Sequence, residues 1–162
     1  MRLPPTLAGA LALLVALAGC GDDSDVGASG CGPIIREALD PSYLVHVLGD
    51  ATAEYTSDPP TSGPHQATPP IEGVVDEPLS RPVQVGVLER GDVLLQHDPE
   101  LPAAERDDLA ALAGAGVVVA PNPDLDDPVV ATAWLHKRTC ERVDGRELEE
   151  FVEQRRGRGP ED

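Results

Sequence analysis

The chain has 162 residues and a formal net charge of −17, from 29 acidic and 12 basic side chains. A charge of this sign and size argues against binding to nucleic acid and against electrostatic binding to anionic lipid head groups. Aromatic side chains make up 2% of the residues. The length and composition therefore predict one small domain with a modest core.

The N-terminus has the order of an export signal. Arg2 precedes an apolar run over residues 7–17, which is too short to span a bilayer but has the length of a signal-peptide core. Small residues then precede Cys20, as in a bacterial lipobox. We therefore expect residues 1–19 to be removed and Cys20 to be lipidated, which gives an extracytoplasmic protein anchored to the cell membrane. The alternative is an ordinary secretory signal with a chance cysteine.

Residues 20–40 are predicted to form a flexible tether, because residues 21–32 are mostly Gly, Asp and Ser. With Cys20 lipidated, Cys31 and Cys140 are the two remaining cysteines. In an oxidising compartment we expect them to form a disulfide, which a small exported domain commonly needs. Two free thiols or two metal ligands are the alternative, but neither cysteine lies in a C-x-x-C pair.

Residues 41–162 are predicted to form a single domain. It begins with an arm over residues 41–82 that is rich in proline, with seven prolines between positions 58 and 82. We expect this arm to be ordered and wrapped on the domain, because a bare linker is usually polar and repetitive. Within it, residues 44–48 indicate a short strand or an extended segment.

Regular elements are predicted over residues 83–157. Alternating apolar residues at 83–88, a turn at 89–92 and a second strand at 93–97 indicate a β-hairpin. Pro102 begins a predicted helix that ends at Gly114, and strands are expected at 117–120 and 129–134. Asp144 and Glu147 have capping-box spacing at the start of a last helix. This ββαββα order predicts an α+β fold, in which a small mixed β-sheet is packed by two helices. The strand, helix and strand between residues 93 and 120 are expected to join parallel strands by a crossover.

A longer motif lies inside the arm: Tyr55, then Ser57-Asp58-Pro59-Pro60-Thr61-Ser62-Gly63-Pro64-His65. With Gly73-Val74, Leu88-Glu89, Asp98-Pro99, Thr132-Ala133-Trp134 and Gly159-Pro160-Glu161, it resembles a bacterial lipoprotein family, common in actinobacteria, catalogued as domain of unknown function 3105. The resemblance covers roughly residue 46 to the C-terminus. It implies fold and location, and it brings no established activity. The family pattern has two histidines where this chain has Gly86 and Arg90, so a family site there would be lost or rebuilt in this chain.

Serine catalysis at Ser62 is not expected, although His65 lies three residues on. The sequence around Ser62 is not a strand-to-helix elbow, and nothing identifies an acid to orient the histidine. No catalytic residue is therefore assigned. The rigid arm is expected to direct His65 towards the predicted turn that carries Glu89, since the resemblance makes both segments rich in motif residues.

Two classes of function remain. The first is a non-catalytic, surface-anchored module that binds a protein or small-molecule partner. The second is a zinc- or copper-binding protein or a metal-dependent enzyme, with His65, Glu89 and His46 as candidate ligands. Asp76 is an alternative carboxylate ligand to complete such a site. The four histidines are scattered singly along the chain. Their spacing therefore favours the first class.

Overall fold

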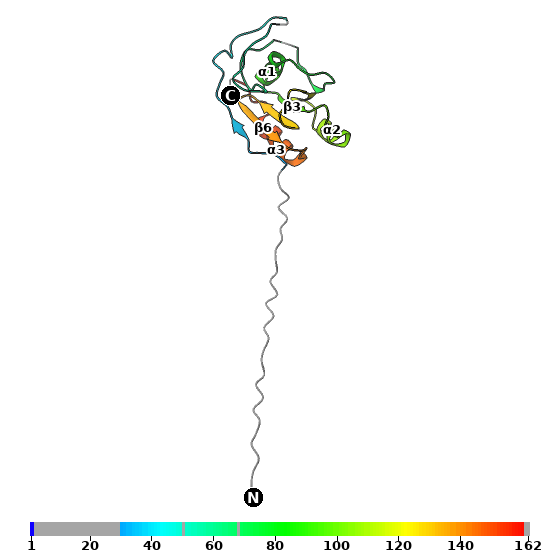
Figure 1. The fold of residues 1–162 in the computed structure, drawn as a ribbon. Coiled ribbons are helices and arrows are strands. Elements are labelled where there is room, and N and C mark those ends of the chain that lie inside the picture. The colour runs from blue at the N-terminus through cyan, green and yellow to red at the C-terminus, as the bar shows by residue number, and fades with distance from the viewer. Residues whose placement is uncertain (2–29, 50, 68, 161–162) are drawn as a thin grey trace.

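The structure, a computed structural model, describes residue 1 and residues 30–49, 51–67 and 69–160. Its centre is a six-stranded mixed sheet with strand order β1-β6-β5-β3-β4-β2 (Figure 1). The elements are β1 Ile35–Arg36, β2 Gly73–Val74, α1 Arg81–Glu89, β3 Val93–His97, α2 Ala103–Ala110, β4 Val117–Pro121, β5 Val129–Ala133, β6 His136–Cys140 and α3 Gly145–Arg155. The predicted α+β class with a mixed sheet is confirmed. The predicted signal peptide and Cys20 lie outside the described residues.

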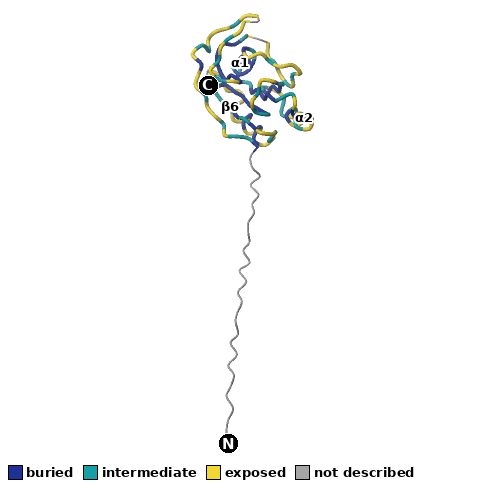
Figure 2. Tube along the Cα trace, viewed as in Figure 1, coloured by how far each residue is buried: buried dark blue, intermediate teal, exposed yellow. Residues whose placement is uncertain are grey.

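The sheet carries helices on both faces. The side chains of Leu109 from α2 and of Leu148 and Phe151 from α3 pack with alternate residues of β3, β4 and β5 on one face. On the other face, Val85 and Leu88 of α1 pack with the intervening strand residues. The central strands are buried along their length, while most of the arm is exposed or half-buried and residues 59–65 of it are buried (Figure 2). None of the helices that the structure describes combines the length and apolarity needed to cross a bilayer.

The predicted crossover is confirmed, since β3 and β4 pair in parallel and α2 connects them. The predicted helix after Asp144 is also confirmed as α3. The Asp144 carboxylate accepts a hydrogen bond from the Glu147 backbone N–H at 3.2 Å. Local signals of apolar runs and capping therefore located these elements correctly.

The predicted strand at residues 83–88 is wrong, because these residues form helix α1. Alternation of valine favours a strand. However, α1 lies between the sheet and the proline-rich arm, and six of its nine residues are buried. Because most of the helix is buried, its apolar pattern does not mark a single buried face. Pro82 occupies the first turn of this helix, where its missing N–H costs no hydrogen bond. The sheet is consequently packed by three helices and not by two.

Strand β6 was not predicted, and the strand predicted at 129–134 ends at Ala133 as β5. Leu135, with a φ of 59°, forms part of the turn between β5 and β6. The β6 sequence is mostly polar, yet Lys137 and Arg138 are both buried. Lys137 pairs with Glu37 and Arg138 pairs with Glu147, so the charges are compensated by partners from outside the strand.

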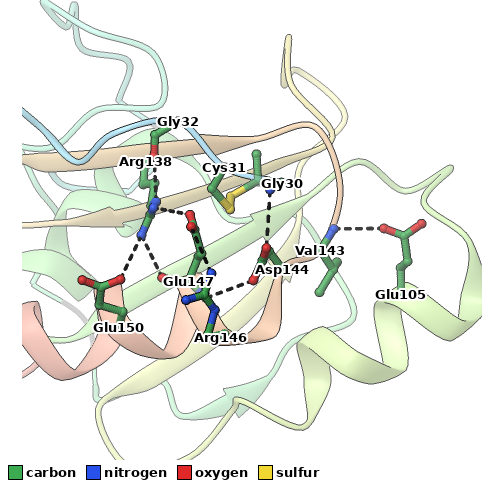
Figure 3. Close-up of a disulfide and its surroundings, with 11 residues drawn as sticks. Gly30, Cys31, Gly32, Glu105, Arg138, Val143, Asp144, Arg146, Glu147 and Glu150 are labelled. Carbon is green, nitrogen blue, oxygen red and sulfur yellow. Dashed lines mark hydrogen bonds and ion pairs between the residues drawn. A yellow bond between two sulfur atoms is a disulfide. The ribbon is translucent and has the colours of Figure 1, made fainter. Parts of the chain in front are cut away.

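The disulfide between Cys31 and Cys140 is confirmed (Figure 3). It joins the start of the described chain to the end of β6, and Arg138 donates a hydrogen bond from Nε to the Gly32 carbonyl oxygen at 2.8 Å beside it. β1 then pairs with β6. Residues 30–40, which the sequence assigned to the tether, thus belong to the folded domain, because the disulfide and the strand pairing bind them to it.

Candidate metal centre

The motif at residues 55–65 is fixed to the rest of the domain by the half-buried carboxylate of Glu37. The hydroxyls of Ser57 and Thr61 both donate to Oε2 of Glu37, each at 2.6 Å. The Lys137 ammonium lies 2.9 Å from Oε1 of the same group and also donates to the carbonyl oxygen of Asp58. Several polar contacts, centred on the Glu37 carboxylate, therefore attach the arm to the edge of the sheet.

Burial alone would raise the pKa of Glu37. The hydrogen bonds from Ser57, Thr61 and Lys137, together with the charge of Lys137, outweigh burial and hold that pKa below its ordinary value of 4.5. The ionised carboxylate is thus the form that stabilises the arm.

This lowered pKa predicts a pH-dependent stability. A depressed acid contributes stability that is present above its unfolded pKa and is lost as the pH falls through its folded pKa. The free energy of unfolding should therefore exceed that of Glu37→Gln by a constant amount above pH about 5, and the difference should shrink below pH about 4. Urea unfolding across this range measures it, with exposed Glu153→Gln as the control. A difference that grows on acidification would contradict the role given to Glu37.

Three further contacts shape the end of the motif. Tyr55 donates its hydroxyl to the Pro64 carbonyl oxygen at 2.8 Å, and burial raises the pKa of Tyr55 to about 12. Gly63 has a φ of 132°, and an added Cβ would lie 3.0 Å from the Tyr55 ring. Ser62 Oγ accepts from the backbone N–H of Asp40 at 2.9 Å. Ser62 thereby connects the arm to the backbone at Asp40.

The backbone places His46 and His65 side by side. The His65 N–H donates to the Val45 carbonyl oxygen, and the Val47 N–H donates to the His65 carbonyl oxygen, which makes a short parallel bridge. The two rings lie with centroids 4.4 Å apart at an interplanar angle of 66°. His65 is 1% exposed and His46 is exposed. The site therefore has one rigid, buried imidazole and one at the surface.

Glu89, the last residue of α1, completes the group. Its Oε2 lies 3.0 Å from Nε2 of His65, and Nε2 of His46 lies 3.2 Å from the same nitrogen. One ligand atom from each residue lies within 4.8 Å of the others. The structure thus brings together the three residues that the sequence singled out. His97, His136 and Asp76 do not join them within the described part of the chain.

The hydrogen bonds of His65 explain why a cation fits this group. Nδ1 lies 3.2 Å from the Gly63 carbonyl oxygen, which only accepts, so the network assigns a proton to Nδ1. In a neutral ring Nε2 then presents a lone pair to the Glu89 carboxylate. Two electron-rich atoms at 3.0 Å repel unless a proton or a metal ion lies between them. The short contact is thus compatible with a hydrogen bond between the two groups or with a cation bound by both.

Two of the three separations between ligand atoms are close to those of a transition-metal site, and all three atoms lie within 4.8 Å of one another. Bonds of about 2.0–2.1 Å to N and O ligands place neighbouring ligand atoms about 3.3 Å apart in a tetrahedron. The observed separations from His65 Nε2 are 3.0 and 3.2 Å. Glu89 is 36% exposed and His46 is exposed, so a fourth position faces solvent. Three protein ligands with one open position allow an ion to be exchanged or to bind a further ligand.

The positions of the two family histidines contribute no ligand here. A Cβ at Gly86 would lie 2.5 Å from the carbonyl oxygen of Gln66, so a side chain at 86 does not fit against the arm. Arg90 donates to the Gly86 carbonyl oxygen at 3.0 Å and to Asp92 at 3.2 Å. Neither Gly86 nor Arg90 therefore contributes a ligand, and the cluster consists of His46, His65 and Glu89.

The fold and this cluster define a class of protein: an α+β domain in which a proline-rich arm presents two histidines to a helix-terminal glutamate. The chain belongs to the family described as Protein of unknown function (DUF3105), whose family model matches residues 46–162. No curated protein and no solved structure shows a significant match to it. The matched region begins at His46 and includes all three cluster residues.

Proposed function

We propose that this protein is a non-catalytic metal-binding module of the cell envelope, which binds one zinc or copper ion through His46, His65 and Glu89. The observation that carries the proposal is the position of His65 Nε2, which lies within 3.2 Å of both His46 Nε2 and Glu89 Oε2. Two imidazoles and one carboxylate are ligands that suit zinc and copper better than calcium or magnesium. The net charge of −17 also favours the approach of cations.

A role in binding is favoured over catalysis by what surrounds the ligands. A hydrolytic metal site needs a general base or acid in reach of the metal-bound water. Among the described residues, no further carboxylate or imidazole joins the three ligand atoms. The Ser62 hydroxyl accepts a hydrogen bond from the Asp40 backbone N–H. The open position therefore serves ligand or ion exchange in this proposal.

The metal function is tested by titrating purified protein, stripped with a chelator and dialysed, with Zn²⁺ or Cu²⁺ in a calorimeter. We expect one ion per chain by elemental analysis, and no comparable heat from Ca²⁺ or Mg²⁺. A protein that retains neither zinc nor copper would contradict the proposal.

A second candidate role is structural, and the burial of His65 favours it. A protonated His65 paired with Glu89 ties the arm to the end of α1 with no metal. The pair has one fully buried member, and loss of such a partner usually destabilises a fold. The variants described in the Discussion distinguish this role from metal binding.

The envelope location rests on the lipobox order at Cys20, outside the described residues. We expect labelled palmitate to enter the wild-type protein in a bacterial host and not Cys20→Ala, because the cysteine thiol is the acylated group. The matched control is Cys31→Ala, which should still be labelled. Unlabelled wild-type protein cut at another position would refute the anchor.

A further inference from the structure

We propose a second binding site, for a phosphate-type oxyanion, in a pocket at the C-terminal end of α3. The pocket has a volume of about 180 Å³, and its lining includes Arg36, Trp134, His136, Arg155, Arg158 and Gly159. It shares no residue with the histidine–glutamate cluster and does not depend on the proposed metal function. Its ligand class follows from the charge, the hydrogen-bonding state and the size of this pocket.

The charge of the pocket is opposite to that of the protein. The chain has a net charge of −17, yet three arginines and a histidine meet here. Several arginines of the domain pair with a carboxylate, as Arg81 does with Asp58 and Arg138 with Glu147. By contrast, the guanidinium groups of Arg36, Arg155 and Arg158 make no ion pair with any residue that the structure describes.

The fold holds these charges close together. Arg36 of β1 and Ala133 of β5 flank His136 of β6 in the sheet register, so the three side chains lie on the same face. The small side chain of Ala133 leaves room, and Arg155 and Arg158 approach from α3 and the segment after it. Nε of Arg155 is buried, and it has no hydrogen-bond partner among the described residues. A buried N–H without an acceptor is costly, and a small rotation of the Arg155 side chain would let an oxyanion in the pocket supply the acceptor.

The electrostatics agree with a missing negative charge. Burial, followed by the charge of Arg158, lowers the pKa of Arg155. Burial also lowers the pKa of His136, and the charges of Arg155, Arg36 and Arg158 lower it further. Neighbouring positive charges lower one another's pKa, and an anion bound among them stabilises the charged forms.

The ligand is expected to be a small tetrahedral oxyanion. Guanidinium groups bind phosphate and sulfate oxygens in pairs, with more directional contacts than an ammonium makes. About 180 Å³ suits a phosphate or a small phosphomonoester, whereas larger ligands usually occupy pockets above about 300 Å³. Such a phosphate is either free or part of a lipid head group.

The position of the pocket favours free phosphate. The chain enters the described fold at Gly30, beside Asp144 at the start of α3 and near Cys140 at the end of β6 (Figure 3). The pocket lies at the opposite ends of these two elements, near Arg155 and His136. A tether at Gly30 therefore does not direct the pocket towards the membrane.

His136 adds a pH dependence. Its Nδ1 lies 2.8 Å from the Trp134 carbonyl oxygen and donates to it, so protonation places a new N–H on Nε2. The charged groups that face this ring are Arg36 from β1 and Arg155 and Arg158 from α3 and beyond, while β5 contributes the uncharged Ala133. An added anion offsets the three positive charges, so its binding favours protonation of His136. Affinity should accordingly rise as the pH falls from about 8 to about 6.

The test uses sulfate and inorganic phosphate as probes, titrated calorimetrically into the purified protein at low and constant ionic strength. Sulfate keeps its charge over this pH range and isolates the effect of His136. We expect Arg155→Gln and Arg158→Gln to weaken sulfate binding by about tenfold or more. Arg146→Gln on the exposed side of α3 has the same charge change and should alter affinity by less than about twofold. His136→Gln should remove the pH dependence.

Each outcome bears on the proposal. Equal weakening by Arg155→Gln and Arg146→Gln would show a net-charge effect and overturn the site. Because Arg158 is exposed, Arg158→Gln tests the pocket even if Arg155→Gln folds poorly. Glu161→Gln combined with Asp162→Asn should bind sulfate at least as tightly, and a loss would contradict the proposed lining. Vesicles containing phosphatidic acid that bind the wild type in an Arg158-dependent way, with no binding of free phosphate, would overturn the choice of a free anion.

Discussion

Replacing His65 by alanine is expected to abolish tight binding of zinc and copper and to lower the free energy of unfolding by about 2–3 kcal/mol even without metal. The ring is 1% exposed and contacts Gly63, His46 and Glu89. Its removal leaves a cavity and takes a partner from each of these three groups. Denaturant unfolding of the apo and metal-loaded proteins measures both effects. In the wild type, metal at about 100 times its Kd should add about 2.7 kcal/mol, and this increment should be absent from the variant.

A stability loss in His65→Ala does not by itself separate a ligand from a structural residue, and His46 provides the matched variant. His46 is exposed and contributes its ring to the cluster without being part of the core. We expect His46→Ala to weaken zinc binding by about 100-fold or more while the stability of the apo protein changes by less than about 1 kcal/mol. His136→Ala, a histidine outside the cluster, should leave zinc affinity unchanged.

The same variants also test whether the cluster has a structural role without metal. In the structural role, His65 and Glu89 form an ion pair, so His65→Ala would lower stability while wild type and His46→Ala show the same lack of stoichiometric metal. Glu89→Gln keeps the size of the side chain and removes its charge. Unchanged zinc affinity in Glu89→Gln would exclude the carboxylate as a ligand.

Removing the disulfide with Cys31→Ala and Cys140→Ala is expected to lower the free energy of unfolding by about 4–5 kcal/mol. The two cysteines are 109 residues apart in sequence, so the bond closes a loop that contains nearly all the described elements. In the chain-entropy estimate, a loop of this length restricts the unfolded chain strongly. Alanine is chosen because Cys140 is 1% exposed, and a serine hydroxyl there would add a buried polar group.

Guanidinium chloride unfolding of the double variant and of reduced wild type measures the effect of the disulfide. The reduced wild type and the double variant should agree closely, and a reducing agent should leave the double variant unchanged. A wild-type midpoint that does not respond to reduction, with free thiols detected, would contradict the role of the disulfide in stability. The size of the effect also predicts that the domain folds poorly in a reducing compartment.

Several features followed from local sequence. Continuous apolar residues indicated β3 and β4, and the spacing of Asp144 and Glu147 indicated the start of α3. These signals are local because apolar runs are buried in any fold and a cap satisfies N–H groups within its own turn. The count of cysteines was sufficient to predict the disulfide, since two cysteines remain once Cys20 is set aside.

Tertiary structure decided the elements whose burial comes from distant partners. The valines of α1 alternate like a strand, but packing between the sheet and the arm makes them helical. The sequence of β6 is mostly polar, and Lys137 and Arg138 can be buried in it because they pair with Glu37 and Glu147. Local patterns report neither arrangement, because each charge or apolar face is satisfied from elsewhere in the chain.

The same division holds for the two candidate sites. The sequence singled out His46, His65 and Glu89, but their spacing has no ligand motif, and a backbone bridge and the end of α1 bring their atoms together. The arginine pocket had no signal beyond basic residues near the C-terminus, which suit the end of a helix. Arg36 reaches that pocket only because β1 pairs with β6. Residue types are local properties, whereas the distances between side chains depend on pairings that close long loops, and these are fixed by the whole core.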